Sequence, residues 1–284
     1  MNRKLAFLLL ALLIVSILIN LFLTREIIVF DKMAEGRFYN RIKKLGWLDE
    51  KVPFEEVKSP NTMIALAIGQ SNAASTSNQT YTTKNAVFSY YKGSLYKAME
   101  PLLGSGGDGG CVWTILADKL IDSGLYQKVI LIPIAVGSTR IEDWTVGKES
   151  KKLNEVLDDL NSKGIKLTHI FWHQGESNTG DDKNNYKANL KLLLRNIRKH
   201  NQPAPFYCSV ATYNFYVNNA FNGVDTVLQN AQKEFVLEND NVISGPNTDS
   251  IIYAIDRYDS QHFSAIGNLK YADLWFKALK NSFE

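Results

Sequence analysis

A serine after a buried-looking strand and a histidine near the C-terminus are the residues of this sequence most suited to acyl-transfer chemistry. Ser71 stands in the stretch "GQSN", directly after the apolar run 62–68. His262 follows Asp259 by three residues in "YDSQHF". At that spacing the Asp259 carboxylate can bind one ring nitrogen of His262, which leaves the other nitrogen free to accept a proton from a serine hydroxyl.

The spacing of apolar runs predicts an α/β domain that could bring these residues together. Five short apolar runs are typical of buried strands: 62–68, 128–136, 167–175, 205–212 and 241–245. Amphipathic patterns predict helices over 111–124, 149–164, 184–200, 224–239 and 264–282. Strands that alternate with helices form a parallel sheet, and ligands bind at the carboxyl ends of its strands. Three polar segments that contain glycine fall at such ends: 69–72, 137–140 and 173–178.

These blocks together resemble the SGNH hydrolase superfamily, and more narrowly its sialate O-acetylesterase and acetylxylan esterase branch, carbohydrate esterase family 6. The resemblance rests on "GQSN" after the first strand, a glycine after the second, "HQGESN" after a later strand and "DxxHF" near the C-terminus. It spans about residues 61–280. It implies a three-layer α/β/α sandwich with a parallel sheet, the flavodoxin-like SGNH hydrolase fold. It also implies a serine esterase that removes acetyl groups from carbohydrates without a metal or other cofactor.

The resemblance assigns catalytic roles to the matching positions. Ser71 matches the nucleophile, which would form an acetyl-serine intermediate, and His262 matches its base. Asp259 matches the acid that orients the histidine. Glu176, within "HQGESN", is a second candidate for that orienting role. Local spacing favours Asp259, and the choice between the two carboxylates stays open at this point.

The resemblance also indicates how the substrate would be held. The backbone N–H groups of Ser71 and Gly137 and the side-chain amide of Gln174 match the oxyanion hole. Arg140 could contact an anionic sugar, or it could pair with Glu142 or Asp143, as exposed arginines commonly do. The candidate substrate-binding residues are Gln70, Asn72, Asn178 and Arg140.

Composition excludes several other classes of protein. The chain has 284 residues, 45% of them hydrophobic, and a formal charge of +3, without the clustered basic residues of a nucleic-acid-binding face. Cys111 and Cys208 are far apart and form no CxxC, so a zinc site is not expected, and nothing in the sequence supports a disulfide between them. Trp144 and Trp172 are more typical of core residues than of sugar-stacking platforms. The expected partner is an acetylated carbohydrate.

The N-terminus predicts a membrane anchor. Residues 5–23 contain no charged side chain, and roughly 20 apolar residues are enough to cross a bilayer as a helix. No small-residue cleavage site follows, and Arg3 and Lys4 favour a cytoplasmic N-terminus. We therefore expect a signal-anchor helix over 1–24, a stalk over 25–60 and an esterase domain over 61–284, with the catalytic domain outside the cytoplasm and the membrane as a partner.

Two other functions stay open on sequence alone. A glycan O-acetyltransferase could use the same acetyl-serine, with a sugar hydroxyl in place of water as the acceptor. A catalytically inactive glycan-binding module on a membrane stalk is the third possibility, which an intact set of Ser71, Asp259 and His262 disfavours.

Overall fold

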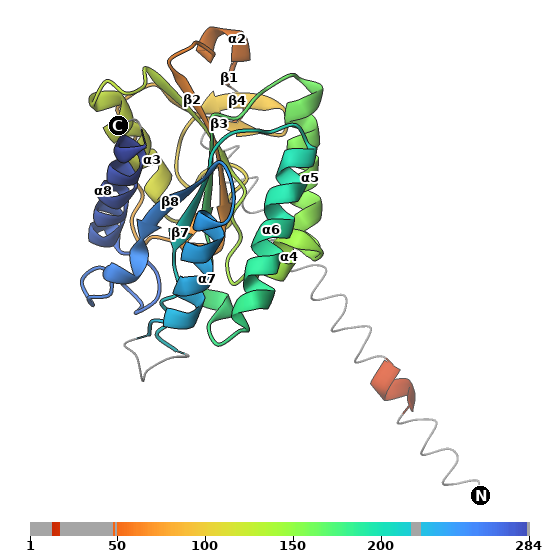
Figure 1. Ribbon diagram of the computed structural model, residues 1–284. Helices are drawn as coiled ribbons and strands as arrows, with labels where there is room; N and C mark the ends of the chain where they lie inside the picture. Colours follow the sequence, from red (N-terminus) through yellow and green to blue (C-terminus); the bar gives the residue numbers. More distant parts are fainter. Residues whose placement is uncertain (1–12, 18–47, 49, 217–222, 283–284) are drawn as a thin grey trace, which may run out of the picture. The chain divides into compact units, whose positions relative to one another are not determined.

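An eight-stranded sheet forms the centre of the computed structural model (Figure 1), which describes residues 13–17, 48, 50–216 and 223–282. The strand order is β1-β4-β3-β5-β2-β6-β7-β8. Parallel pairing joins the six strands from β3 to β8 in this order, whereas β4 pairs antiparallel with both β3 and β1. The strands are β1 (Lys51–Val52), β2 (Thr62–Gly69), β3 (Val87–Tyr91), β4 (Ser94–Lys97), β5 (Lys128–Pro133), β6 (His169–His173), β7 (Phe206–Val210) and β8 (Val242–Asn247). The predicted α/β class and all five predicted strands are confirmed.

The five predicted helices are also confirmed, each with small shifts at its ends. Apolar residues at helical spacing and a capping side chain, such as Asp182 before α6 or Ser264 before α8, set where several of them begin. The short helices α2 and α4 were not predicted. The helices are α2 (Phe54–Val57), α3 (Val112–Asp122), α4 (Ile141–Thr145), α5 (Lys148–Ser162), α6 (Lys183–Lys199), α7 (Thr226–Leu237) and α8 (Ala265–Asn281).

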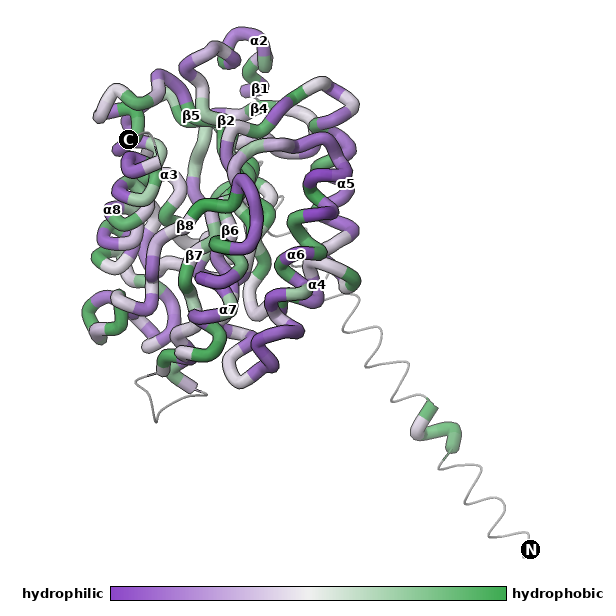
Figure 2. The backbone as a smooth tube through the Cα atoms, viewed as in Figure 1, coloured by the Kyte–Doolittle hydropathy of each residue, from purple (hydrophilic) through white to green (hydrophobic). Residues whose placement is uncertain are grey.

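Two hydrophobic cores, one on each face of the sheet, hold the helices in place. Ile64 and Leu66 of β2 belong to a core with buried side chains of α5, α6 and α7. Met63 and Ala65, which alternate with them and point to the other face, belong to a core with α3 and α8. Figure 1 shows these two helix groups on opposite sides of the sheet, and Figure 2 shows hydrophobic stretches along the strands between them. The sheet and the helices on its two faces therefore form the predicted three-layer α/β/α sandwich.

The boundary of this unit differs from the prediction. The chain divides into two compact units, residues 1–50 and 51–284. Lys51 pairs with Tyr96 of β4, and Val57 of α2 is buried in the core, so the part of the predicted stalk from residue 51 onward belongs to the sheet unit.

The predicted membrane anchor lies almost wholly outside the described residues. Leu13 to Ile17 form a helical segment within it. Among the residues that the structure describes, no helix is both long and apolar enough to cross a membrane.

Candidate active site

The turn that carries Ser71 begins where β2 ends, at Gly69. Gly69 has a φ of +139°, and a Cβ atom there would lie 1.9 Å from the carbonyl oxygen of His173 at the end of β6. Only glycine allows the two strand ends to approach this closely. Ser71 then starts the 3₁₀ helix η1 (Ser71–Ala73), and the Thr76 hydroxyl donates a 2.7 Å hydrogen bond to the Ser71 carbonyl oxygen. The strand therefore places Ser71 at the carboxyl edge of the sheet.

His262 and Asp259 form a close pair in the loop before α8. Nδ1 of His262 lies 2.6 Å from Asp259 Oδ2, and the His262 backbone N–H donates to Asp259 Oδ1 at 2.6 Å. Burial alone would raise the pKa of the Asp259 carboxyl, but hydrogen bonds from His262 and from the Gln261 backbone outweigh it and lower the pKa. An ionised Asp259 holds the proton of the ring on Nδ1, so Nε2 is the nitrogen that can accept a proton.

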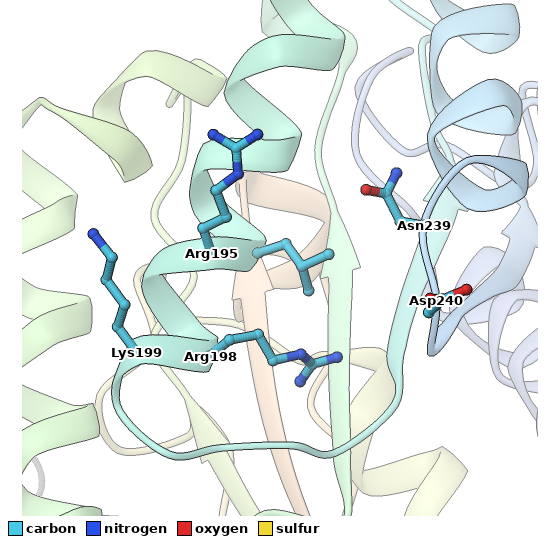
Figure 3. A pocket seen from close by; sticks show the side chains of 6 residues that line it. Arg195, Arg198, Lys199, Asn239 and Asp240 are labelled. Carbon is cyan, nitrogen blue, oxygen red and sulfur yellow. The ribbon is translucent and has the colours of Figure 1, made fainter.

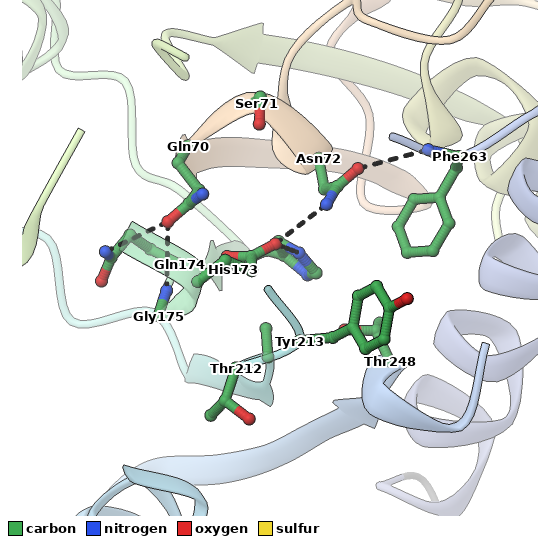
Figure 4. Close-up of polar contacts among 12 residues, drawn as sticks. Gln70, Ser71, Asn72, His173, Gln174, Gly175, Thr212, Tyr213, Thr248 and Phe263 are labelled. Atoms are coloured by element: carbon green, nitrogen blue, oxygen red, sulfur yellow. Dashed lines mark hydrogen bonds and ion pairs between the residues drawn. The ribbon is translucent and has the colours of Figure 1, made fainter. Parts of the chain in front are cut away.

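Asn72 connects the serine turn to the histidine loop. Its Nδ2 donates to the Gln261 carbonyl oxygen at 3.4 Å. Its Oδ1 accepts from the Phe263 backbone N–H at 3.4 Å, as Figure 4 shows. The residue after Ser71 is thus bonded to both chain neighbours of His262. Within the described residues no hydrogen bond joins Ser71 Oγ to the His262 ring, and such bonds often tighten only when substrate binds.

Two of the three predicted oxyanion donors are available. Among the described residues, the backbone N–H groups of Ser71 and Gly137 donate no hydrogen bond. A Cβ atom on Gly137 would lie 3.7 Å from the Ser71 Cβ, so this glycine backbone faces the serine. Free backbone N–H groups near a nucleophile can stabilise the negative charge of a tetrahedral intermediate.

The third predicted donor, Gln174, is engaged elsewhere, and its predicted oxyanion role is not supported. Its side chain is wholly buried, and its Nε2 donates to Asn178 Oδ1 at 2.6 Å, Thr139 O at 3.1 Å and Gln70 Oε1 at 3.2 Å. Its Oε1 accepts from the Tyr186 hydroxyl of α6. Gln174 therefore joins three loops beneath the site, and both of its amide hydrogens are used.

Glu176 does not contact the His262 ring. Its Oε1 accepts from Asn72 Nδ2 at 2.9 Å and lies 3.0 Å from His173 Nε2, while His173 Nδ1 lies 2.7 Å from the Tyr271 hydroxyl. Burial alone would raise the pKa of Glu176, but His173 and Asn72 outweigh it and lower the pKa. Of the two candidate carboxylates, the structure places Asp259 on the histidine and Glu176 in a buried network that supports Asn72.

The predicted substrate-binding residues mostly make internal contacts. Asn178 is wholly buried and bonds to Glu142 and Asp181 as well as to Gln174. The Arg140 guanidinium pairs with Asp181 and Glu142 and donates to the Ser177 carbonyl oxygen, in accordance with the alternative of simple charge pairing. The Oε1 atom of Gln70 accepts three hydrogen bonds from the segment 174–177. These residues therefore connect the loop segments 69–72, 137–140 and 173–178 to one another.

Comparison with known proteins agrees with this geometry. The model of the family described as carbohydrate esterase, sialic acid-specific acetylesterase, matches residues 61–279. The chain belongs to this family of carbohydrate esterases. No sequence among the curated proteins matches it.

Solved structures with the same fold include three informative relatives of this carbohydrate esterase. A protein from Arabidopsis thaliana is 18% identical with a TM-score of 0.64, covering 80% of this chain and 100% of its own. A carbohydrate acetylesterase from Xanthomonas citri is 17% identical with a TM-score of 0.56, covering 77% of this chain and 56% of its own. A lipase/acylhydrolase from Enterococcus faecalis is 13% identical with a TM-score of 0.51, and the match covers 78% of this chain and 96% of that protein. These likenesses show that the chain shares its fold with a carbohydrate acetylesterase and a lipase/acylhydrolase.

Sequence reasoning missed two residues, Thr76 and Tyr258, that contact the segments of Ser71 and His262 in this esterase. The Tyr258 hydroxyl donates to the Thr76 carbonyl oxygen at 3.0 Å, and the Thr76 hydroxyl in turn donates to the Ser71 carbonyl oxygen. The Tyr258 ring also stacks on the His262 ring, with centroids 6.2 Å apart. The one available signal was an aromatic residue directly before the "DxxH" pair.

Other features of the esterase lie apart from this site. A cavity of about 500 Å³ lies beside the C-terminal end of α6, at the amino ends of the strands (Figure 3), and is lined by Leu194, Arg195, Arg198, Lys199, Asn239 and Asp240. Trp144 and Trp172 are wholly buried core residues, and both cysteines are free and buried. Within the described ranges, no three His, Cys, Asp or Glu side chains are grouped to hold a metal ion.

Proposed function

We propose that this carbohydrate esterase hydrolyses O-acetyl esters through an acetyl-serine intermediate on Ser71. The observation that carries the proposal is the 2.6 Å pair of Asp259 and His262, bonded through Asn72 to the turn that presents Ser71. This arrangement supplies a nucleophile, a base with a defined tautomer and two free backbone donors beside the nucleophile.

The reaction follows from this arrangement in two balanced steps. Ser71 Oγ attacks the acetyl carbonyl carbon while His262 Nε2 takes the hydroxyl proton, and the Ser71 and Gly137 N–H groups hold the oxyanion. When the intermediate collapses, His262 returns the proton to the departing sugar oxygen and leaves the acetyl group on Ser71. Water then attacks the acetyl-serine with His262 as the base, which releases acetate and restores the serine.

The test compares the full-length chain with Ser71→Ala and with the matched control Ser123→Ala, an exposed serine at the end of α3. Acetate release from p-nitrophenyl acetate and from an acetylated xylo-oligosaccharide is measured for each. We expect Ser71→Ala to lose at least about 10⁴-fold in kcat and Ser123→Ala to match the wild type. Mass spectrometry of quenched wild-type protein should show an acetyl group on Ser71. Undiminished activity in Ser71→Ala would refute the assignment.

We also propose that residues 5–23 anchor the enzyme in a membrane with the catalytic domain outside the cytoplasm. The support is the length and apolar character of this segment and the basic residues Arg3 and Lys4 before it. Protease added to intact cells should digest the esterase domain if the orientation is correct, and a domain that is protected until the cells are lysed would contradict it.

A further inference from the structure

Two exposed tyrosines contact the turn that carries the catalytic pair. The Tyr216 side chain, 70% exposed, donates from its hydroxyl to the Asp259 carbonyl oxygen at 3.1 Å. Tyr258, 46% exposed, stacks on the His262 ring and donates from its hydroxyl to the Thr76 carbonyl oxygen. The two rings therefore come from different loops, and both contact the turn 258–262: Tyr216 through the Asp259 backbone and Tyr258 through the His262 ring.

Both rings are held in position although their faces meet solvent. Each hydroxyl is bonded to a backbone carbonyl, and the Phe215 ring packs edge-on against Tyr216 with centroids 5.5 Å apart. The Phe215 backbone N–H also donates to the Gln261 side chain, which ties this segment to the histidine loop. Exposed apolar surface beside a site is typical of a place where a ligand binds. An aromatic ring that is already ordered loses little conformational entropy when the ligand binds to it.

Carboxylates lie near the Tyr258 ring. Burial, together with the carboxylates of Asp259 and Asp108, raises the pKa of Tyr258. The two arginines of the neighbouring site segments are engaged: Arg140 pairs with carboxylates, and Arg257 is 3% exposed. The Arg257 guanidinium lies between two aromatic rings, within 4.4 Å of each centroid, and donates to backbone carbonyls. A carboxylated sugar would therefore meet like charge here.

We propose that Tyr216 and Tyr258 form a subsite that binds the apolar face of an uncharged sugar ring of the acetylated substrate. The ring would stack on the tyrosines and bring its ester to Ser71, as carbon-bound hydrogens of a sugar pack on an aromatic face. This inference rests on the proposed esterase function, and it adds where the sugar binds and which charge it carries.

The experiment measures kcat/KM of the full-length protein for three acetyl esters. These are an acetylated xylo-oligosaccharide, which is uncharged, 9-O-acetyl-N-acetylneuraminic acid, which carries a carboxylate, and p-nitrophenyl acetate, which has no sugar. The variants are Tyr216→Ala and Tyr258→Leu, with Tyr216→Phe to keep the ring. Tyr253→Ala is the matched control, because Tyr253 is also an exposed tyrosine, at 68%, and its ring contact is with the Lys270 ammonium, 6.0 Å from the ring centroid.

We expect Tyr216→Ala and Tyr258→Leu to lower the ratio of kcat/KM for the oligosaccharide over the aryl ester by roughly 3- to 10-fold, mainly through KM. Tyr216→Phe and Tyr253→Ala should keep the wild-type ratio, and the wild type should prefer the uncharged sugar over the carboxylated one. An unchanged ratio in both ring-deleting variants, or a preference for the carboxylated sugar, would overturn the subsite while leaving the esterase intact. If the wild type and Ser71→Ala are equally inactive on all three esters, the proposed function itself fails.

Discussion

Replacing Asp259 with asparagine tests whether this carboxylate orients His262, the proposed catalytic base. Asparagine keeps the shape of the side chain and can still accept the backbone N–H bonds from Gln261 and His262. Its amide hydrogens, however, can face His262 Nδ1, which would move the ring proton to Nε2. With a proton on Nε2, the ring cannot accept the proton of Ser71, so Asp259→Asn should fold but turn over slowly.

The expected loss of kcat can be estimated from the hydrogen bond between Asp259 and His262. A hydrogen bond to a charged group contributes about 1.5–3 kcal/mol, equivalent to about 10- to 150-fold in rate, and the wrong tautomer in a fully buried triad costs about 10⁴ in kcat. The Asp259 side chain is 37% exposed, so water can partly replace the lost carboxylate. We therefore expect Asp259→Asn to lose about 10²- to 10³-fold in kcat.

The assay measures the steady-state rate with p-nitrophenyl acetate for Asp259→Asn and Glu176→Gln in parallel. The rate of Ser71→Ala is subtracted as the background. Glu176 contacts Asn72 and His173, so its variant should lose less in kcat than Asp259→Asn and more in stability. If Glu176→Gln loses 10³-fold while Asp259→Asn stays within a few fold, the assignment of the orienting acid is refuted.

The lowered pKa of Asp259 gives the same variant a pH signature. Because the folded-state pKa is below that of the unfolded chain, the ionised carboxylate stabilises the fold above pH of about 4, and this contribution is lost as pH falls through the folded-state value. The difference in free energy of unfolding between the wild type and Asp259→Asn should therefore shrink in acid. A difference that grows as pH falls would contradict this account.

Three further substitutions test the architecture around the serine. Gly137→Ala would place a methyl group 3.7 Å from the Ser71 Cβ, so kcat/KM should fall about 100-fold with little change in melting temperature. Gly107→Ala would place a Cβ 2.2 Å from the Ser75 carbonyl oxygen at a φ of +85°, and urea unfolding should show a loss of about 1–3 kcal/mol. Trp113→Ala would remove a wholly buried ring, at a cost of about 3–5 kcal/mol in the same measurement.

The main elements of the fold could be predicted because their patterns are local. Strands buried on both faces are nearly continuous apolar runs, and the long helices show apolar residues at helical spacing. The hairpin of β3 and β4 lacked such a pattern, because its strands contain Ser and Tyr and lie toward the edge of the sheet. Its two-residue turn at Lys92 and Gly93, both with positive φ, suits a hairpin but is a weak signal without alternating neighbours.

Within the candidate site, the sequence could predict where a residue lies only when its position in the chain determines that location. Ser71 is such a residue, because it directly follows the end of a strand. Asp259 and His262 are such residues too, because their three-residue spacing brings the two side chains together within one loop. The direction of Gln174 depends instead on which acceptors surround it, and these come from Gln70, Thr139 and Asn178 in three separate segments. A buried amide must satisfy its hydrogens, and so neighbouring loops rather than the motif determine its role.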